Sequence, residues 1–569
     1  MLIDSKKHTL FLEQELQAQI KDFESKLNTS ASQLLLVDNL MYVAKFIKFR
    51  NDGELLLKLS SKHKLPRRNE YLYAITVPDQ YRSYKNWGDM TYGNLIEKKT
   101  AFSEVHCVWQ APSEDDNFCL IGMRGVSAEF AEYLEKVPGC IVILGPQVPP
   151  FEYLANLQKV VSNSTYEINS DELDSNDNVS PILITDNAFD CMTNSVSNND
   201  INILQGPPGT GKTYLIAQLC KYYCDKGMSV LVTALTNRAL MEVASKPFLE
   251  ELLKQERVYK TNITCDEVSE QPLLVPTNKL NPEKGSLKLS TFYLTSGVAS
   301  EMCSPYQERY DIVIMDEASQ AFLGMFLASL KLGKKILWVG DTKQMPPIVL
   351  MNEDRIIRHG FNIFVDGMSF MVNSRKYPVY QLTYTYRLSP LSTELTSLFY
   401  KGNLTSMSNG KNLSPILLTL PMKLADASPE DAINRAVEII INLYRNNGEI
   451  HVAFLSHKIE TVKAMQKKLN GFEPDKKNLT IETVARIQGL TVDYTIYLVP
   501  RNDCMVYSLE DRLFNVATSR AKSRTIIIGD DGLLNYCHKS QIVSSYLKGM
   551  KHYDITKGIS NDLMRELLK

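Results

Sequence analysis

A glycine-rich stretch, Gly206–Thr213, has the spacing G-x-x-x-x-G-K-T, with an apolar run before it and a helix-like segment from Tyr214 after it. Glycines let consecutive backbone N–H groups turn toward one point, and a helix N-terminus adds partial positive charge there. Such a loop binds phosphates: we expect the Lys212 ammonium to reach the β- and γ-phosphates and the Thr213 hydroxyl to hold Mg²⁺. The predicted nucleotide-binding residues of the loop are Gly206, Pro207, Pro208, Gly209, Thr210, Gly211, Lys212 and Thr213.

Two adjacent carboxylates, Asp316 and Glu317, end a second apolar run at 311–315. The carboxyl edge of a parallel sheet is where such sheets bind ligands. Taken alone, a pair of acids after a strand is usually a solvated strand end. Beside a phosphate loop, we expect Asp316 to hold the Mg²⁺ shell and Glu317 to orient and deprotonate the attacking water.

From about residue 181 onward, continuous apolar runs alternate with helical segments, which indicates parallel sheets covered on both faces. The runs are too numerous for one sheet, so two α/β domains are expected, 181–365 and 366–569. The apolar runs lie at 201–204, 229–233, 311–315, 335–339, 495–499 and 525–529.

The N-terminal third has a different pattern of apolar and polar residues. Residues 1–33 are expected to form a helix with Leu10, Leu12, Leu16 and Ile20 on one face. Short alternating runs separated by Gly, Pro and Asn predict a β-rich accessory domain at 34–161, with a helix near 128–136. The polar, acidic segment 162–180 is expected to be a linker.

Composition limits the class of protein. The 569 residues carry a net charge of −2, so any nucleic-acid binding needs a local channel rather than a general basic field. The ten cysteines form no C-x-x-C pair, and no apolar stretch reaches the roughly 18 residues of a membrane span. We expect an intracellular protein, cytoplasmic or, in a eukaryote, nuclear, without a zinc module or membrane partner.

Six ordered motifs between about 181 and 535 resemble superfamily 1 helicases, in the branch that holds the nonsense-mediated-decay helicase, senataxin and their bacterial and viral relatives. The resemblance implies two tandem RecA-like P-loop domains beside the accessory domain, with ATP and Mg²⁺ as cofactors. The motifs are 205–213, 316–321, 339–347, 385–390, 487–489 and 515–521.

The resemblance also implies roles for single residues. Gln344 corresponds to the residue that senses the γ-phosphate, and Gln488 to one that couples the nucleotide site to the nucleic-acid site. Arg387 and Arg520 resemble the two arginines that the second domain points at the triphosphate, where they would neutralise charge in the transition state. Tyr386 resembles an aromatic residue that stacks on the base.

Polar residues after strands are the candidates for nucleic-acid contacts. Thr233, Asn237 and Thr291 in the first domain, with Thr483 in the second, have short side chains suited to sugar-phosphate contacts without sequence information. The alternative is that they are ordinary polar strand ends. Phe292 is expected either to stack on a base or to pack in the core.

The chain departs from the family pattern on the base and sugar side of the nucleotide. Asn187 stands where a glutamine usually recognises adenine, and Thr491 stands where a glutamate usually bonds the ribose, two positions after Gly489. Gly489 is itself assigned to the nucleotide site. The phosphate chemistry is complete, whereas base and sugar recognition are altered.

Three functions remain open at this stage. The first is a translocating helicase, by resemblance 5′→3′, acting on single-stranded or tailed-duplex nucleic acid, with DNA and RNA undecided. The second is an ATP-gated clamp or scaffold that holds nucleic acid and recruits proteins, for instance through the N-terminal domain, without processive unwinding. The third, an NTPase acting on small molecules or proteins, leaves the two-domain motif set without an obvious use.

Overall fold

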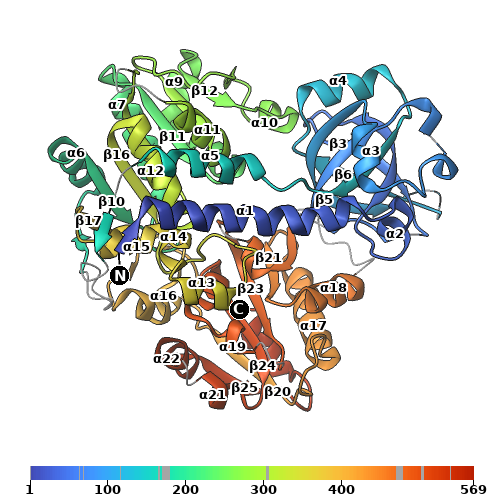
Figure 1. Ribbon diagram of the computed structural model, residues 1–569. Coiled ribbons are helices and arrows are strands. Elements are labelled where there is room, and N and C mark those ends of the chain that lie inside the picture. Colours follow the sequence, from blue (N-terminus) through green and yellow to red (C-terminus); the bar gives the residue numbers. More distant parts are fainter. Residues whose placement is uncertain are drawn as a thin grey trace.

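The computed structural model describes residues 2–569 except 63, 68–69, 82, 114, 116, 165–166, 170–179, 303–306, 470–477, 488, 502–504 and 538–539. Gln488 and most of the expected linker 162–180 therefore lie outside the described residues. Two parallel sheets and a closed barrel are joined by a long helix (Figure 1). Within the described residues, no helix is both long and apolar enough to cross a membrane.

The first parallel sheet has nine strands, and its hydrophobic core lies on both faces. Ile203, Val313 and Trp338 pack on one face, and their neighbours Leu204, Ile314 and Val339 pack on the other. This alternation explains why the strands are continuous apolar runs. In sheet order the strands are β13 (Val275–Thr277), β12 (Val258–Thr261), β14 (Leu287–Thr291), β11 (Val230–Ala234), β15 (Tyr310–Met315), β16 (Gly333–Gly340), β10 (Ile201–Gln205), β17 (Val379–Leu382) and β9 (Ile182–Ile184).

The first sheet continues beyond residue 365, where the sequence suggested a seam. β17 at 379–382 pairs with both β10 and β9, so the chain returns to this sheet before it enters the second one. Between them, α13 (Glu353–His359), α14 (Asn362–Val365) and α15 (Gly367–Asn373) add Ile356, Phe364 and Met371 to the core of the first sheet. A four-residue strand such as β17 carries too short a pattern to be assigned from sequence.

The second parallel sheet has six strands and is again covered on both faces. Leu418 and Ile528 belong to one core, while the adjacent Leu417 and Ile527 belong to the other. In sheet order the strands are β22 (Leu479–Thr483), β21 (Val452–Ser456), β23 (Val492–Val499), β24 (Ala521–Asp530), β20 (Ile416–Leu420) and β25 (Lys551–Asp554). We refer to the two sheets with their covering helices as the first and second lobes.

The helix α1 (Ser5–Leu27) runs across the middle of the molecule in Figure 1 and joins the first lobe to the barrel. Phe11 and Leu12 belong to the core of the first lobe, whereas Phe23 packs in the core beside the barrel. The expected apolar face needs correction, since Leu10 is 43% exposed. Residues 10 and 12 are about 200° apart around a helix and cannot share one face.

The barrel closes in the order β2-β3-β6-β5-β4-β7, and all its strand pairs are antiparallel. The helix expected near 128–136 is confirmed as α4 (Ala128–Lys136). Beyond the barrel, α5 (Phe151–Ser162) packs on the first lobe through Leu154 and Leu157. The barrel strands are β2 (Tyr42–Phe49), β3 (Leu55–Ser60), β4 (Tyr71–Thr76), β5 (Ala101–Pro112), β6 (Phe118–Arg124) and β7 (Ile141–Pro146).

Candidate active site

The glycine-rich loop joins β10 to the helix α7 (Lys212–Asp225), as its sequence context predicts. Gly209 and Gly211 have φ values of 72° and 80°, a region that side chains rarely adopt. A Cβ atom on Gly209 would also lie 2.4 Å from the Cβ of Arg387, so a larger residue would push the second lobe away. The Lys212 ammonium donates to the carbonyl oxygens of Gly206 (2.5 Å) and Pro207 (3.4 Å).

Asp316 and Glu317 follow β15 at its carboxyl end, beside this loop. One Asp316 oxygen accepts the Glu317 N–H at 2.8 Å, and burial raises the pKa of Asp316 to about 6. Burial and the neighbouring Asp316 carboxylate raise the pKa of Glu317 to about 8. Glu317 has a φ of 51°, and its Oε2 atom has no hydrogen-bond partner among the described residues. A strained backbone and an unpaired carboxylate oxygen are typical of functional positions.

The two predicted arginines of the second lobe meet the glycine-rich loop of the first. Thr385 Oγ1 donates to the Pro208 carbonyl at 2.9 Å, and the Tyr386 N–H donates to the Gly209 carbonyl at 2.9 Å, which brings Arg387 to the loop. The Arg387 guanidinium donates to the Ser519 carbonyl at 3.2 Å, immediately before Arg520.

The charges of this cluster act on one another. Burial and then Arg387 lower the pKa of Arg520 to about 9, while burial lowers that of Arg387 to about 10. Burial also lowers the pKa of Lys212, which Arg387 and Arg520 depress further against the pull of Asp341 and Asp316. Three neighbouring cations with depressed pKa values, of which Arg520 is fully buried, form a site that a polyanion would stabilise.

Asp341 joins the two lobes beside the glycine-rich loop. In the sequence, only its position inside the motif 339–347 indicated that it belongs to the site. Its Oδ1 accepts from Gln205 Nε2 (2.7 Å) and the Lys343 N–H (3.0 Å). Its Oδ2 accepts from Gln344 Nε2 (2.8 Å) and from the hydroxyl of Tyr400 (2.7 Å), which belongs to the second lobe. Gln344 thus shares one carboxylate oxygen with a residue of the other lobe.

Tyr400 and Asn515 complete this link, and no motif in the sequence pointed to Tyr400. The Asn515 side-chain amide donates to the Tyr400 hydroxyl (2.9 Å) and to the Lys343 carbonyl (2.8 Å). Burial and Asp341 raise the pKa of Tyr400 well above its ordinary value, so the hydroxyl keeps its proton and donates it. Met345 of the first lobe packs against the core of the second.

The residues expected on the base and sugar side differ in their surroundings. Asn187 begins helix α6 (Ala188–Asn198), where its Oδ1 accepts the Phe189 N–H at 3.0 Å and its Nδ2 donates to Asp190 at 2.8 Å. Its amide is therefore engaged within its own helix. Tyr386 is 63% exposed and has a free ring. Gly489 has a φ of 85°, and a Cβ there would lie 3.9 Å from Glu317 Oε1.

Two of the predicted nucleic-acid contacts need correction. Thr233 is fully buried and its hydroxyl is paired with Thr295 Oγ1 at 2.9 Å, because β11 is a central strand. Phe292 is fully buried in the core of the first lobe, which corresponds to the packing alternative rather than to base stacking.

The other predicted contacts, Thr291, Asn237 and Thr483, are more exposed than Thr233 and Phe292. Thr291 is 9% exposed. Asn237 is half-buried, and its side-chain oxygen accepts a hydrogen bond from Lys260 Nζ at 3.0 Å. Its NH₂ group takes no part in this hydrogen bond. Thr483 is half-buried and its N–H donates to Glu482 Oε1 at 2.7 Å.

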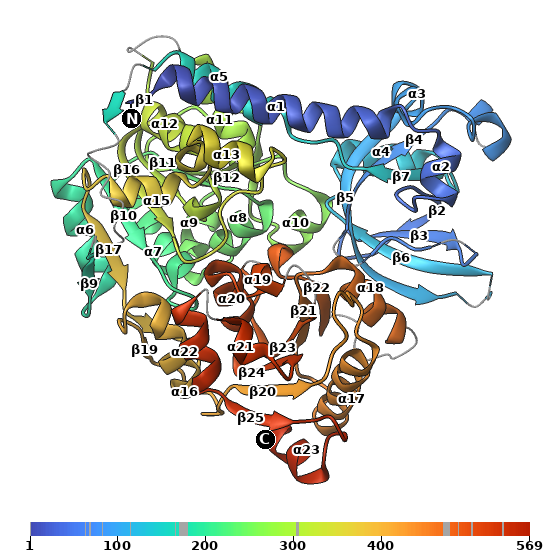
Figure 2. The same cartoon turned by 60° about the horizontal axis from the view of Figure 1, so that its bottom comes forward.

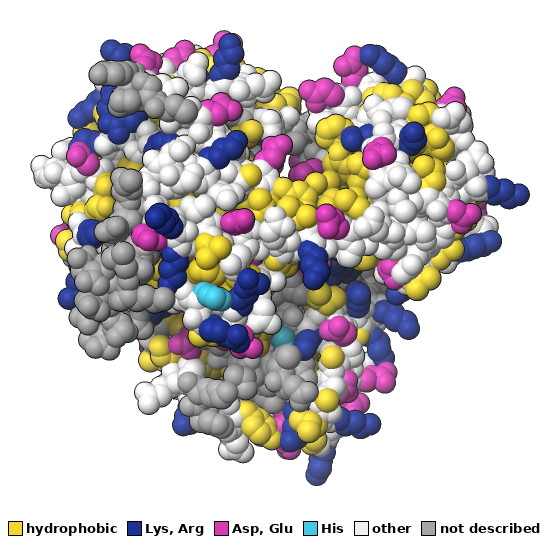
Figure 3. All heavy atoms as spheres, viewed as in Figure 1, with side chains coloured by type: hydrophobic (Ala, Val, Ile, Leu, Met, Phe, Trp, Pro, Cys, Tyr) yellow, Lys and Arg dark blue, Asp and Glu magenta, His cyan; other side chains and the backbone are white. Residues whose placement is uncertain are grey.

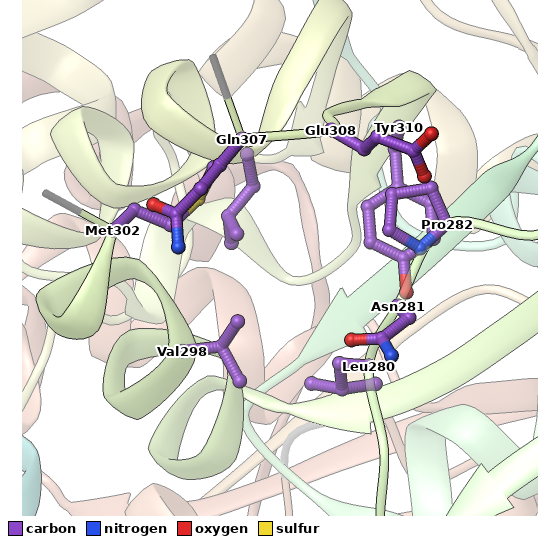
Figure 4. Close-up of a pocket in the computed structure, with 9 residues that line it drawn as sticks. Leu280, Asn281, Pro282, Val298, Met302, Gln307, Glu308 and Tyr310 are labelled. Carbon is purple, nitrogen blue, oxygen red and sulfur yellow. The ribbon is translucent and has the colours of Figure 1, made fainter. Parts of the chain in front are cut away.

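A cavity of about 230 Å³ in the first lobe is separate from the cluster of Lys212, Glu317 and the arginines (Figure 4). Tyr310, which lines it, is the first residue of β15, whereas Asp316 follows the end of that strand. Six residues of extended strand span about 20 Å. Figure 3 shows Lys and Arg side chains scattered over one face rather than gathered into a single basic field.

Comparisons with known proteins match parts of the chain to one protein family and to ATP-dependent helicases. A family described as "AAA domain" matches residues 191–350. The DNA replication ATP-dependent helicase/nuclease DNA2 of Gallus gallus is 26% identical over 366 residues, which are 58% of this chain and 34% of that protein. An uncharacterised ATP-dependent helicase of Methanocaldococcus jannaschii is 25% identical over 252 residues, 40% of this chain and 36% of that protein. The chain spans about a third of the length of these relatives.

Among solved structures, an arterivirus nonstructural protein 10 (helicase) aligns with 85% of this chain and 80% of its own, at 14% identity and a TM-score of 0.36. That score is too low to carry an argument. The matching family and the similar sequences support the resemblance to superfamily 1 helicases of the DNA2/NAM7-like branch that the six ordered motifs indicate.

Proposed function

We propose that this protein couples the hydrolysis of ATP in the cleft between its lobes to movement along single-stranded nucleic acid and to the unwinding of a duplex. The observation that carries the proposal is the meeting of Lys212 and two carboxylates of the first lobe with Arg387 and Arg520 of the second. Such a site is complete only when the lobes are closed, so nucleotide binding and lobe closure are coupled.

Each charged group has a task in the hydrolysis. Lys212 leaves the Gly206 carbonyl and binds the β- and γ-phosphates, while Thr213 and Asp316 would hold Mg²⁺ together with the phosphate oxygens. The ion, when bound, neutralises phosphate charge. Among the described residues, no group of three His, Cys, Asp or Glu side chains is arranged to hold a metal.

Glu317 acts on the attacking water. Its unpaired Oε2 accepts the water proton, and Lys212 and Arg520 oppose the rise in its pKa, which favours the ionised form that a base needs. Arg387 and Arg520 neutralise the charge that develops on the transferred phosphoryl group.

We propose that the two lobes are tandem RecA-like domains and that the barrel with α1 is an accessory domain. The expected limits were 1–33, 34–161, 181–365 and 366–569, and the path of β17 moves the entry into the second domain beyond residue 382. Direction 5′→3′ follows only from resemblance to the branch.

Motion of the lobes reaches the nucleic acid through the link at Asp341. Loss of the γ-phosphate frees Gln344, which shares Asp341 Oδ2 with Tyr400 of the second lobe. A change at the nucleotide therefore alters a contact between the lobes directly. Residues that follow strands in both lobes, among them Asn237, Thr291 and Thr483, would grip successive phosphates and shift relative to one another.

The test measures ATP hydrolysis and strand release on tailed duplexes of DNA and of RNA, with Glu317→Gln as the matched variant. We expect hydrolysis that single strands stimulate, release from a duplex with a 5′ tail, and a loss of about 100-fold or more in turnover for Glu317→Gln with nucleic-acid binding retained. Stimulated hydrolysis and stable binding without strand release would support the ATP-gated clamp instead. Hydrolysis that no nucleic acid stimulates would contradict both proposals.

A further inference from the structure

An aromatic pair lies at the exposed end of the barrel ladder between β4 and β5. Tyr71 and His106 are directly opposite each other across the two strands, with ring centroids 5.2 Å apart and planes inclined by 30°. Tyr71 is 54% exposed. Further along the ladder, Tyr73 and Ile75 are covered by the core beside α1, so the ladder is open only at this end.

The aromatic pair lies where the barrel meets the first lobe. Next to it, Gly125 donates its N–H to Asp266 Oδ1 at 2.9 Å, and the Val126 carbonyl accepts the Cys265 N–H at 3.0 Å. A Cβ on Gly125 would lie 3.6 Å from His106 Nδ1, so the His106 ring adjoins this contact. Both Cys265 and Asp266 begin helix α10 (Cys265–Glu270).

Helix α10 is also linked, through Lys260, to the predicted nucleic-acid contact Asn237. Glu267 on α10 pairs with the buried Lys260 at 2.8 Å, and Lys260 donates to Asn237 Oδ1 at 3.0 Å. Glu270 on α10 pairs with Arg238 at 3.4 Å, although the Arg238 side chain is 76% exposed. A chain of contacts thus leads from Tyr71 through His106 and α10 to Asn237 and Arg238.

Charged groups of both lobes surround the aromatic pair. Burial lowers the pKa of His106, Asp266 opposes this, and the guanidinium groups of Arg124 and Arg238 add to it. Desolvation of the covered part of the Tyr71 side chain raises its pKa, and the Arg486 guanidinium of the second lobe opposes that rise.

The pair also borders the start of helix α11 (Phe292–Glu301). The pKa of Tyr293, which follows Thr291 and Phe292, is raised to about 12 by burial, Glu104 and Tyr71. Arg486 lies three residues after Thr483, at the carboxyl end of β22, and Figure 2 shows β22 below the junction of β5 and α10. Tyr71 therefore lies near Tyr293, which closely follows Thr291, and near Arg486, which closely follows Thr483.

We propose that Tyr71, backed by His106, is a platform on which one base of a single strand stacks, with the adjoining phosphates beside Arg238 and Arg486. The inference rests on the proposed function and names a contact that the accessory barrel contributes to it. An exposed aromatic ring between arginines is the arrangement by which single strands are held without regard to sequence, because every base has a π-face. His106 supports Tyr71 from behind and leaves the outer part of the ring free.

The test is fluorescence anisotropy of a labelled oligothymidine of about 20 nucleotides, a length that covers the site sizes of such grooves. We expect Tyr71→Ala to raise Kd by about 5- to 100-fold, while Tyr71→Phe stays near wild type because the ring is kept. Hydrolysis of ATP without nucleic acid stays unchanged. The oligonucleotide concentration that half-stimulates hydrolysis rises as Kd does, whereas the maximal rate stays the same.

Two further variants separate stacking from charge and from folding. Arg486→Gln removes one phosphate contact, so the slope of log Kd against log salt falls by about 0.7, while Tyr71→Ala leaves the slope unchanged. Tyr84→Ala removes an exposed tyrosine that lies against Trp87 on the same N-terminal part, and it is expected to bind normally. Melting curves check that each variant is folded.

The outcomes of these binding measurements distinguish failure of the platform from failure of the proposed function. Normal binding by a folded Tyr71→Ala overturns the platform and leaves the proposed function intact. Equal losses for Tyr71→Phe and Tyr71→Ala also overturn it, because the hydroxyl rather than the ring would then be the contact. If wild type itself binds no single strand, the proposed function fails and the platform with it.

Discussion

Glu317 combines a left-handed backbone, an unpaired carboxylate oxygen and a pKa raised from its ordinary value of 4.5 to about 8. In the unfolded chain this carboxyl ionises near 4.5, whereas in the folded protein it keeps its proton up to about 8. The folded state therefore binds more protons between these values. Its contribution to stability is fully present below about pH 4.5 and is lost as the pH rises to about 8, by about 1.4 kcal/mol per pH unit.

Glu317→Gln removes this ionisation, and we expect its melting temperature to exceed that of wild type by a margin that grows from pH 5 to pH 8 and then levels off. The measurement is thermal unfolding in EDTA without nucleotide, so that no ion pairs with the carboxylate. Glu13→Gln, which removes the same charge from an exposed position on α1, is the control and should follow wild type. Parallel curves for Glu317→Gln and wild type would contradict the raised pKa.

At the scale of elements, the short helix η6 (Ser397–Tyr400) and helix α20 (Asp511–Thr518) carry the contacts to Asp341 and Lys343. Tyr400→Phe removes only the hydroxyl, so Asp341 loses one donor and the Asn515 amide loses an acceptor. A hydrogen bond to a buried carboxylate contributes about 1.5 to 3 kcal/mol. We expect turnover at saturating ATP to fall about 10-fold, because Gln344 is no longer held by both lobes.

The binding of a non-hydrolysable ATP analogue to Tyr400→Phe should stay near wild type, since the loop that holds the phosphates is unchanged. Tyr497→Phe is the matched control, because Tyr497 is equally buried in the same lobe and its hydroxyl donates to the Ser508 carbonyl at 2.9 Å without reaching the first lobe. If both variants lose turnover equally, Tyr400 is merely structural.

At the scale of the whole molecule, closure of the lobes depends on contacts outside the nucleotide site. Arg512 on α20 pairs with Asp366 at 2.6 Å and donates to Ser369 Oγ at 3.2 Å, which joins the second lobe to α15 of the first. Both charged side chains are largely buried, so their attraction is screened less than that of a surface pair. We expect this ion pair to favour the closed arrangement.

A double-mutant cycle of Arg512→Gln and Asp366→Asn tests that expectation. Asp366→Asn keeps the side-chain oxygen that accepts the Ser369 N–H at 3.1 Å, so α15 stays capped. Each single variant should lower stimulated hydrolysis, and the double variant should be no worse than either single one, with a coupling of about 0.5 to 3 kcal/mol. Effects that simply add would show that the pair does not act as a unit.

The same scale explains why α1 matters to the site. Its buried Glu15 accepts the N–H groups of Leu350 (2.9 Å) and Met351 (3.0 Å), just after the motif that contains Asp341 and Gln344. One helix therefore supports that motif's loop at one end and the barrel at the other. The barrel and the nucleotide site are therefore connected through α1. No local pattern in the sequence indicates this connection.

What the sequence determined by itself is the chemistry that depends on neighbouring residues. The phosphate loop, the pair Asp316 and Glu317 and the helix 128–136 follow from short-range spacing, because backbone turns, strand ends and helical periodicity are local properties. The resemblance to superfamily 1 helicases, carried by six ordered motifs, was likewise accessible without coordinates.

Only the tertiary structure decided which distant residues meet. The approach of Arg387 to Gly209, the sharing of Asp341 by Gln344 and Tyr400, and the position of Tyr71 beside α10 depend on how three separate sheets pack. Burial is also decided by the tertiary structure. Thr233 lies near the end of the central strand β11 and Phe292 begins the covering helix α11, and both side chains are enclosed. Packing between elements is a long-range property, and residue spacing along the chain does not encode it.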